Sequence, residues 1–472
     1  MKVKSLILTL WPTLVLVNCG YSQRSTKFSQ LDSLVTKHMS ENHVPGLALA
    51  IVKNGRVIKK EFYGTSNIEK DIPVSNSTVF EIASMTKQIT CAAILLLQES
   101  GRLSVKDFLS KYLSNLPPTW KDITLEELMN HTSGIRDDWD EPTSYFFQNY
   151  TDVKMVEAQK KYPLYFKPGE GFNYSSGPFF LGLIIEKITK RHFSFFFKEN
   201  IFNPLQMFST SVYDSTSIPA NLAIGYRWNN SKLEEGIDIP PSAESRADVG
   251  ILTTIDDLIK WNNALNDTRL LRKESIQAMF EPGKLKDGHY IPYGYGWYIY
   301  YFRNNLIFEH GGAFRTGFNS RITKFLNSDL DIIILSNKWK AGLSDLTYEL
   351  AYYYNHEFKR ISTLQKETDE INKETKEVEK LFYDLSAKKF NRGQLYQQIN
   401  ISGFDPDELE DMFKGFKKVE FIGKLTLQPK SLKLYGSKII KVLYFKIISD
   451  NPTYWSLTYN VSGKLVSANL ED

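Results

Sequence analysis

The sequence SMTKQITCAAILLLQESG, residues 84–101, begins with a serine and a lysine and continues as an apolar run. The run at residues 89–97 is long enough to form a buried helix, and Gly101 is placed to end it. Side chains three residues apart are neighbours on one face of a helix, so this spacing brings Ser84 and Lys87 together. The stretch therefore predicts a buried helix that presents this pair at its first turn.

This pair has the chemistry of an activated nucleophile. A serine hydroxyl is a poor nucleophile until a base removes its proton, and a lysine amine acts as such a base when its charged form is disfavoured. At a helix start, the backbone amide of Ser84 has no partner within the helix and can bind a developing oxyanion. The same spacing occurs by chance in many chains, so the motif needs support from elsewhere in the sequence.

A second candidate is Tyr174 in the segment YSSG, residues 174–177, which an apolar helix-like run follows. A phenol near a lysine ammonium is stabilised as phenolate, because an opposite charge favours the ionised form. Such a phenolate can take the serine proton and deliver it to the leaving group. The simpler interpretation is a partly buried structural tyrosine, one of 26 in the chain.

A third candidate is the segment EHGG, residues 309–312, directly after the strand-like run 306–308. Glycines at a strand edge let another backbone approach closely, as an extended substrate or an oxyanion requires. For His310, the structural alternatives are a metal ligand and a buried, hydrogen-bonded histidine. Metal binding is not favoured, because the seven histidines include no pair at i and i+4.

The first 22 residues are predicted to be a secretory signal peptide. A basic start precedes an apolar stretch at residues 6–17, which is too short to cross a bilayer, and small residues suit cleavage after Ser22. Lipid attachment at Cys19 is a second interpretation, which the preceding Asn18 suits poorly. No later stretch of the sequence is long and apolar enough to span a membrane.

Composition excludes some classes of protein. The 472 residues suffice for two or three domains, and 42% hydrophobic and 24% charged residues are ordinary for a globular protein. A net charge of +4 gives no reason to expect a nucleic-acid partner. Once the signal peptide is removed, Cys91 is the only cysteine, which excludes an internal disulfide and a cysteine-based metal site. Its place in the apolar run indicates a small buried hydrophobe.

The predicted elements follow the order strands, a long helical block, and strands again. Strand-like runs at 47–52 and 56–63 flank Asn54-Gly55, the strongest short-range hairpin signal. Helical segments dominate from residue 84 to about 205. Strand character then returns at 298–308, 318–325 and 331–335. One antiparallel sheet with an N-terminal edge hairpin accounts for this order, with the helical block as a second lobe.

A charged stretch marks a domain boundary in the last quarter of the chain. Residues 357–380 are rich in Glu, Lys and Thr, and they are predicted to form a charged helical linker. Residues 381–472 begin with a short helical region and continue with five strand-like runs, which predicts a small α+β domain. This order of elements is similar to cone-shaped domains of the nuclear-transport-factor-2-like (NTF2-like) type.

The three candidate motifs, in this order, resemble the active-site motifs of penicillin-recognising serine hydrolases: Ser84-x-x-Lys87, Tyr174-Ser-Ser and His310-Gly-Gly. Among these proteins the chain resembles the class C β-lactamase-like group, which includes D-alanyl-D-alanine carboxypeptidases, D-aminopeptidases and some esterases. Further similar runs lie at residues 123–134, 250–258 and 293–297. The resemblance implies a β-lactamase/transpeptidase-like catalytic domain over residues 28–356, with an antiparallel sheet flanked by helices and an all-helical lobe.

The resemblance also implies a mechanism that needs no metal and no cofactor. Ser84 would be acylated by an amide or ester carbonyl, Lys87 and Tyr174 would be the proton-transfer pair, and water would release the acyl group. The backbone amides of Ser84 and Ala313 would form the oxyanion hole. The substrate, a small molecule or a peptide, would contact four further residues: Ser176, His310, Gly311 and Gly312.

Two departures from the family pattern argue against an efficient β-lactamase. Ser176 stands where an asparagine usually contacts the substrate, and His310 stands where a lysine helps bind the substrate carboxylate. With an ordinary pKa of about 6.5, a histidine is mostly neutral at neutral pH and offers less charge. These changes suit an esterase or a peptidase whose substrate is less anionic at that end.

The sequence as a whole therefore predicts an exported serine hydrolase of the periplasm or cell envelope, acting on D-amino-acid peptides, β-lactams or small esters. The alternative from another class is a catalytically silent protein that senses cell-wall fragments or lactams. The presence of Ser84, Lys87 and Tyr174 together argues against that alternative, because a silent protein is free to lose any of them.

Overall fold

The structure, a computed structural model, describes residues 18–136, 148–302, 305–355, 372–387, 389, 400–401, 412–426, 433–434, 437–460 and 462–470. Most of the predicted signal peptide lies outside the described residues, as do parts of the predicted linker and of the C-terminal domain. The first helix, α1 (Asn18–Glu41), includes the position of Cys19. No helix within the described ranges combines the length and apolar character that crossing a membrane requires.

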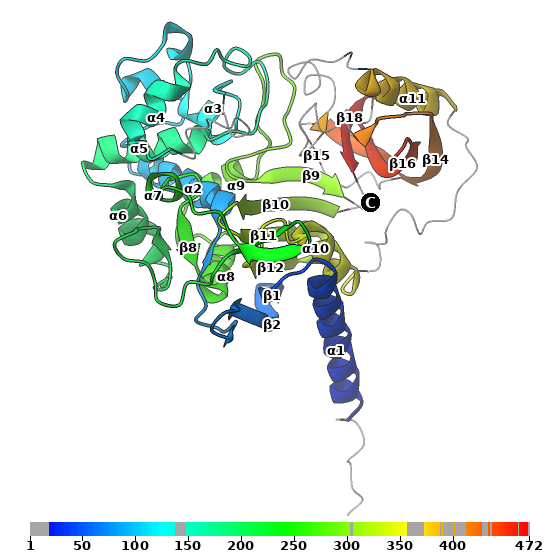
Figure 1. Ribbon diagram of the computed structural model, residues 1–472. Helices are drawn as coiled ribbons and strands as arrows, with labels where there is room; N and C mark the ends of the chain where they lie inside the picture. The colour runs from blue at the N-terminus through cyan, green and yellow to red at the C-terminus, as the bar shows by residue number, and fades with distance from the viewer. Residues whose placement is uncertain are drawn as a thin grey trace, which may run out of the picture.

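The centre of the N-terminal domain is a seven-stranded antiparallel sheet with strand order β3-β2-β1-β12-β11-β10-β9 (Figure 1). Asn54 and Gly55 connect β1 to β2 with positive φ angles of 51° and 70°, which a tight two-residue hairpin turn requires. The N-terminal hairpin thus pairs with strands from the C-terminal half of the domain, as the sequence predicts. The strands are β1 (Gly46–Lys53), β2 (Arg56–Asn67), β3 (Ile72–Pro73), β9 (Tyr298–Phe302), β10 (Asn305–Phe314), β11 (Phe318–Phe325) and β12 (Leu330–Ser336).

Both faces of this sheet are covered, because its central strands are apolar on both sides. In β1 the large residues Leu47, Leu49 and Ile51 join one buried cluster, which includes residues of α1 and α10 (Leu343–Tyr352). The small residues Ala48 and Ala50 point the opposite way and join the main core. There α8 (Ile255–Ala264) packs directly on β1 and β12.

A helical lobe lies beside the sheet and is built around α2 (Thr86–Glu99) (Figure 1). Nearly every residue of α2 is buried, and the helix packs against α5 and α6. The remaining helices of the domain are α3 (Leu125–Met129), α4 (Asp152–Gln159), α5 (Gly177–Thr189), α6 (Phe193–Phe197), α7 (Pro241–Glu244) and α9 (Lys273–Met279). Two small sheets complete it: β4 (Phe80–Glu81), β8 (Ile251–Thr253) and β5 (Ser211–Val212) in one, and β6 (Tyr226–Asn229) with β7 (Lys232–Glu235) in the other.

The C-terminal domain is a second sheet with one described helix packed on it. In α11, Val378 and Phe382 share a buried cluster with Trp455 and Leu457 of the sheet. The strand order is β13-β18-β17-β16-β14, with β15 paired to β16. The elements are α11 (Asn372–Ser386), β13 (Asn400–Ile401), β14 (Lys418–Thr426), β15 (Lys433–Leu434), β16 (Ser437–Ile448), β17 (Thr453–Asn460) and β18 (Leu465–Leu470).

The other face of the C-terminal sheet contacts the N-terminal domain. Ile422, Val442 and Tyr444 belong to the same buried apolar cluster as the main core. At the rim of this contact, Lys464 Nζ lies 3.4 Å from His289 Nε2. The arrangement confirms the predicted α+β class: helices flank an antiparallel sheet, a helical lobe lies beside it, and a separate sheet domain follows.

Candidate active site

Ser84 lies in a short 3-10 turn, η1 (Ala83–Met85), directly before α2 rather than within it. Ala83 has a left-handed backbone with φ of 46°, which is uncommon for a residue with a Cβ atom. A residue of the central sheet fixes this turn in place: Ser320 Oγ of β11 donates a hydrogen bond of 2.7 Å to the Ile82 carbonyl. Ser84 is partly exposed, whereas the residues on either side of it are buried.

Lys87 is buried, with 1% of its surface exposed, and its amine lies beside the serine. Lys87 Nζ is 3.1 Å from Ser84 Oγ and also donates to the Asp248 carbonyl at 3.1 Å. The centre of the Tyr174 ring lies 5.1 Å from the same nitrogen. The structure therefore brings the predicted serine, lysine and tyrosine together around one amine.

Tyr174 lies in the loop before α5 and is held by aromatic neighbours. The centre of its ring is 4.5 Å from that of His131, and the ring stacks on Tyr298 at 5.9 Å. His131 is fixed in turn, because the Ser175 backbone N–H donates to its Nδ1 at 3.2 Å. His131 belongs to the segment 123–134, which the sequence resemblance included without a role, and here it supports the tyrosine.

Two buried histidines face Lys87, and both are neutral. Burial, with a smaller contribution from the Lys87 charge, lowers the pKa of His310 to about 3 and that of His131 well below its ordinary value. The hydrogen bonds of His310 suit the neutral ring: Nδ1 donates to the Gly311 carbonyl at 2.6 Å, and Nε2 accepts from the Tyr293 hydroxyl at 2.9 Å.

The strand β10 presents an open edge next to the nucleophile turn. Its pairing with β9 ends at Glu309, and no strand within the described residues continues along residues 310–314 on that side. Gly312 lies so close to the turn that a Cβ atom there would be 2.0 Å from the Ile82 carbonyl oxygen. Ala313, the predicted oxyanion-hole residue on this edge, is exposed.

The remaining predicted contacts differ in their accessibility. Gly311 is partly exposed on the open edge of β10, and Gly312 beside it is buried. Ser176 is fully buried at the N-cap of α5. Cys91 is a buried free thiol, as predicted, and burial raises its pKa.

The sequence reasoning missed the buried ion pair of Arg246 and Asp248, which lies next to Lys87. The signal for it was two opposite charges in the segment RADVGIL, residues 246–252, directly before a run with apolar character. A group of ligating side chains suited to a metal ion is absent from the residues that the structure describes.

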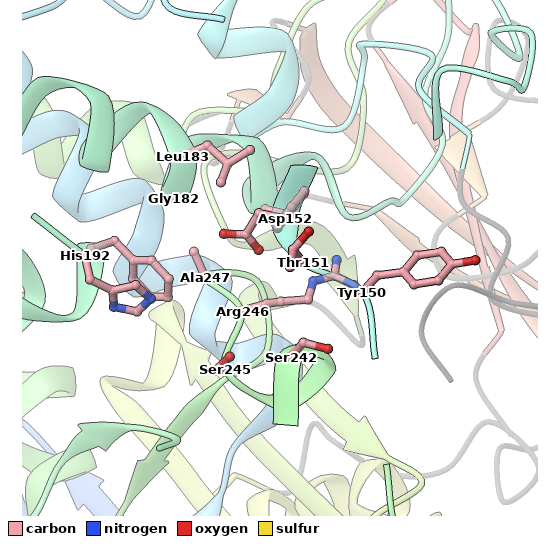
Figure 2. Close-up of a pocket in the computed structure, with 12 residues that line it drawn as sticks. Tyr150, Thr151, Asp152, Gly182, Leu183, His192, Ser242, Ser245, Arg246 and Ala247 are labelled. Atoms are coloured by element: carbon pink, nitrogen blue, oxygen red, sulfur yellow. The ribbon is translucent and has the colours of Figure 1, made fainter. Parts of the chain in front are cut away.

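A cavity of about 240 Å³ lies on the side of Arg246 toward α4 and α5. Figure 2 shows the Arg246 side chain extending across it, with Asp152 on one side and Ser242 on the other. None of Ser84, Lys87 and Tyr174 lines this cavity, so it is distinct from the candidate active site.

The site and the fold together define a class of protein, and comparison with known families agrees. The β-lactamase family model matches residues 31–352, so the chain belongs to the β-lactamase family. Penicillin-binding protein 4* of Bacillus subtilis strain 168 is 28% identical over 348 residues, which cover 70% of this chain and 75% of that protein.

Two solved structures share the fold. The octameric penicillin-binding protein homologue from Pyrococcus abyssi has a TM-score of 0.61 at 22% identity and covers 91% of this chain and 96% of its own. The D-amino acid amidase of Ochrobactrum anthropi SV3, complexed with L-phenylalanine, has a TM-score of 0.61 at 19% identity and covers 70% of this chain and 99% of its own. These similarities confirm the predicted β-lactamase/transpeptidase-like fold.

Proposed function

We propose that the protein is a serine hydrolase that acts on an amide or ester carbonyl through an acyl-enzyme. The observation that carries the proposal is the geometry around Lys87. Its amine lies 3.1 Å from the Ser84 hydroxyl and 5.1 Å from the centre of the Tyr174 ring. A hydroxyl within hydrogen-bond reach of an amine, with a phenol ring beside that amine, supports a mechanism in which the amine and the phenol move the serine proton.

In this mechanism Ser84 Oγ attacks the substrate carbonyl carbon while its proton passes to the pair formed by Lys87 and Tyr174. The carbonyl oxygen becomes an oxyanion, which the backbone N–H groups of Ser84 and Ala313 stabilise. The pair then protonates the leaving amine or alcohol. Water attacks the acyl-enzyme carbonyl while the pair takes its proton, and the pair then returns that proton to Ser84 Oγ as the ester bond breaks and the acid product leaves.

The substrate class we propose is a D-amino-acid amide or peptide, or a small ester, with β-lactams as weaker substrates. The open edge of β10 at residues 310–314 can align an extended acyl chain by main-chain hydrogen bonds. The neutral His310 and the buried Ser176 supply no cation for a carboxylate at that end. Two of the similar proteins are named as a penicillin-binding protein and a D-amino acid amidase, in accord with these substrates.

A labelling experiment tests the reaction class. Wild type and Ser84→Ala are treated with a fluorophosphonate probe and a fluorescent penicillin, and hydrolysis of nitrocefin, a p-nitrophenyl ester and a D-Ala-D-Ala peptide is compared. Labelling of wild type alone, with turnover of the ester or peptide, supports the proposal. Equal absence of labelling in both proteins favours the alternative, a silent sensor of cell-wall fragments.

The proton-transfer pair leads to a quantitative prediction. Lys87→Ala and Tyr174→Phe should each slow acylation by at least about a hundredfold, the usual size of acid–base catalysis. Tyr63→Phe is the matched control. The Tyr63 hydroxyl lies outside the candidate active site and donates a hydrogen bond of 2.6 Å to Asp32. Stopped-flow measurement of ester acylation gives the rates, and full activity in either site variant would show that the roles are misassigned.

We also propose that the first 22 residues direct export to the cell envelope and are then removed. The support is the basic start and short apolar stretch of the sequence. Mass spectrometry of the protein secreted or fractionated from cells checks this, with a mature chain that begins at Gln23 as the expected result. A lipid mass on Cys19 would favour the second interpretation, a membrane-anchored lipoprotein.

A further inference from the structure

The helix that carries Lys87, α2, is hydrogen-bonded on one side to a short segment, residues 246–251, which follows α7. The segment contacts the first turns of α2, and each contact uses a polar group of the helix. Because these groups lie within five residues of α2, the segment is fixed against the part of the helix that carries the amine. The hydrogen bonds join Thr86 Oγ1 to the Ile251 N–H (3.2 Å), Lys87 Nζ to the Asp248 carbonyl (3.1 Å), and Thr90 Oγ1 to the Ala247 carbonyl.

Within this segment Asp248 and Arg246 form a buried ion pair. Asp248 has no exposed surface, and 2% of the surface of Arg246 is exposed. Arg246 Nη2 donates to Asp248 Oδ2 at 3.0 Å, and Nε lies 2.9 Å from Oδ1. The guanidinium lies over the Phe179 ring at 4.8 Å. A charge-assisted contact of this kind fixes the carboxylate in one orientation.

The same carboxylate is the second charge beside the catalytic amine. Asp248 Oδ2 lies 3.9 Å from Lys87 Nζ, and within the described ranges no other carboxylate forms an ion pair with Lys87. The result is a buried row of charges that alternate in sign from Arg246 through Asp248 to Lys87. Because all three side chains are buried, charges this close act strongly on one another.

Other polar and titratable groups around Lys87 come from the elements packed against it. They are the Ser84 hydroxyl of η1, the Cys91 thiol of α2, the His131 ring after α3, the Tyr174 phenol before α5, and the His310 ring of β10. Among the described residues, the Asp248 carboxylate is the one that forms an ion pair with the amine.

We propose that Asp248, held by Arg246, is a positioning residue for Lys87 that fixes its amine between Ser84 and Tyr174 and sets the net charge around this proton-transfer pair. The inference rests on the proposed hydrolase function and adds a residue pair to it. The Asp248 carboxylate does not touch the substrate. It acts through Lys87, and Arg246 acts through Asp248.

The pH dependence of acylation tests this inference, because changes of net charge have predictable signs. Asp248→Asn removes a negative charge and should move both limbs of the pH–rate profile to lower pH, by about one unit. Arg246→Gln removes a positive charge and should move both limbs to higher pH. The double variant changes no net charge, and its limbs should return close to those of wild type. The probe is a p-nitrophenyl ester, and acylation is followed by the release of p-nitrophenolate in a single turnover.

Loss of position is measured at the same time. Asp248→Asn keeps the backbone carbonyl that accepts from the amine but loses the ion pair at 3.9 Å, so acylation at its own optimum pH should slow by about tenfold or more. The matched control is Asp331→Asn, which breaks another buried ion pair, to Lys324 at 3.0 Å, four positions along β11 from Ser320. This control should lower the melting temperature and leave both limbs in place.

Three results would overturn the inference: limbs that do not move, limbs that move in the same direction in both single variants, or an unchanged rate in Asp248→Asn. Thermal melting shows whether each variant is folded. If Asp248→Asn does not fold, two measurements still test the inference. The limbs of Arg246→Gln should move to higher pH, and those of the double variant should lie close to the limbs of wild type. Failure of the proposed function has a different signature, which is a wild-type protein that no probe acylates at Ser84.

Discussion

His310 shows that a residue inside a charged site can itself remain neutral. The Tyr293 hydroxyl donates to one ring nitrogen at 2.9 Å, and the other nitrogen donates to the Gly311 carbonyl at 2.6 Å. Both bonds are made by the uncharged ring, and burial together with the nearby Lys87 charge lowers its pKa to about 3. A substrate carboxylate next to this ring would therefore meet a hydrogen-bonding surface instead of a cation.

This low pKa predicts a pH dependence of stability. The pKa of His310 is about 3 in the folded protein and about 6.5 in the unfolded chain, so between these pH values only the unfolded state binds the extra proton. The contribution of His310 to the free energy of unfolding is therefore complete above pH 6.5 and is lost as pH falls from 6.5 toward 3. The slope for one such histidine is about 1.4 kcal/mol per pH unit. Urea unfolding of wild type and His310→Gln from pH 7 to pH 4 measures it, and the variant should lose less free energy of unfolding per pH unit.

The surface residue His43 provides the control for this measurement. His43 is exposed, and its ring stacks on that of Trp228 at 3.5 Å, so His43→Gln controls for the loss of a histidine at the surface. Equal slopes for wild type and His310→Gln would show that the pKa of His310 in the folded protein is close to its value in the unfolded chain.

At the scale of elements, the predictions that held were those that depend on local pattern. The apolar run at residues 89–97 became α2, and the hairpin at Asn54-Gly55 became β1 and β2, because period and turn chemistry are readable over a few residues. The 3-10 turn at Ser84 was not predictable, since it depends on Ser320 and β10 holding the turn from a distance. The pair of Arg246 and Asp248 was missed for the same reason, because only tertiary packing places it beside α2.

The close contact between β10 and η1 gives a prediction at this scale. In Gly312→Ala, the new Cβ atom would be 2.0 Å from the Ile82 carbonyl oxygen, so the strand must move away from the nucleophile turn. This widens the proposed oxyanion hole, and loss of one donor from such a site costs about a hundredfold in rate or more. Single-turnover acylation of an activated ester measures this loss.

The neighbouring glycine separates geometry from general destabilisation. In Gly311→Ala the nearest atom to the new Cβ would be 3.6 Å away, an ordinary contact, so this variant should keep the unfolding free energy of wild type. Gly312→Ala should be both less stable and slower. A Gly312→Ala protein with wild-type acylation would show that the approach of β10 to η1 is not needed for the reaction.

At the scale of the whole molecule, the two faces of the C-terminal sheet pack against different partners. Leu443 and Phe445 point toward α11 and form the core of the C-terminal domain, whereas Val442 and Tyr444 on the same strand join the core of the N-terminal domain. Successive side chains of β16 point to opposite faces of the sheet, so the same strand contributes to the core of the C-terminal domain and to its contact with the N-terminal domain. Sequence alone could predict the strands but not which face is attached, because both faces carry apolar residues.

This division predicts how two neighbouring substitutions differ. Val442→Asp places an unpaired charge at a position with 2% exposed surface between the domains, so thermal unfolding should separate into two transitions as the C-terminal domain detaches. Leu443→Ala removes core contacts of the C-terminal domain alone and should cost about 2–5 kcal/mol without that separation. Lys464→Ala removes only the exposed contact to His289, 3.4 Å away, and should change stability by less than about 1 kcal/mol. Differential scanning calorimetry distinguishes these outcomes, and a single unchanged transition in Val442→Asp would mean that this face does not hold the domains together.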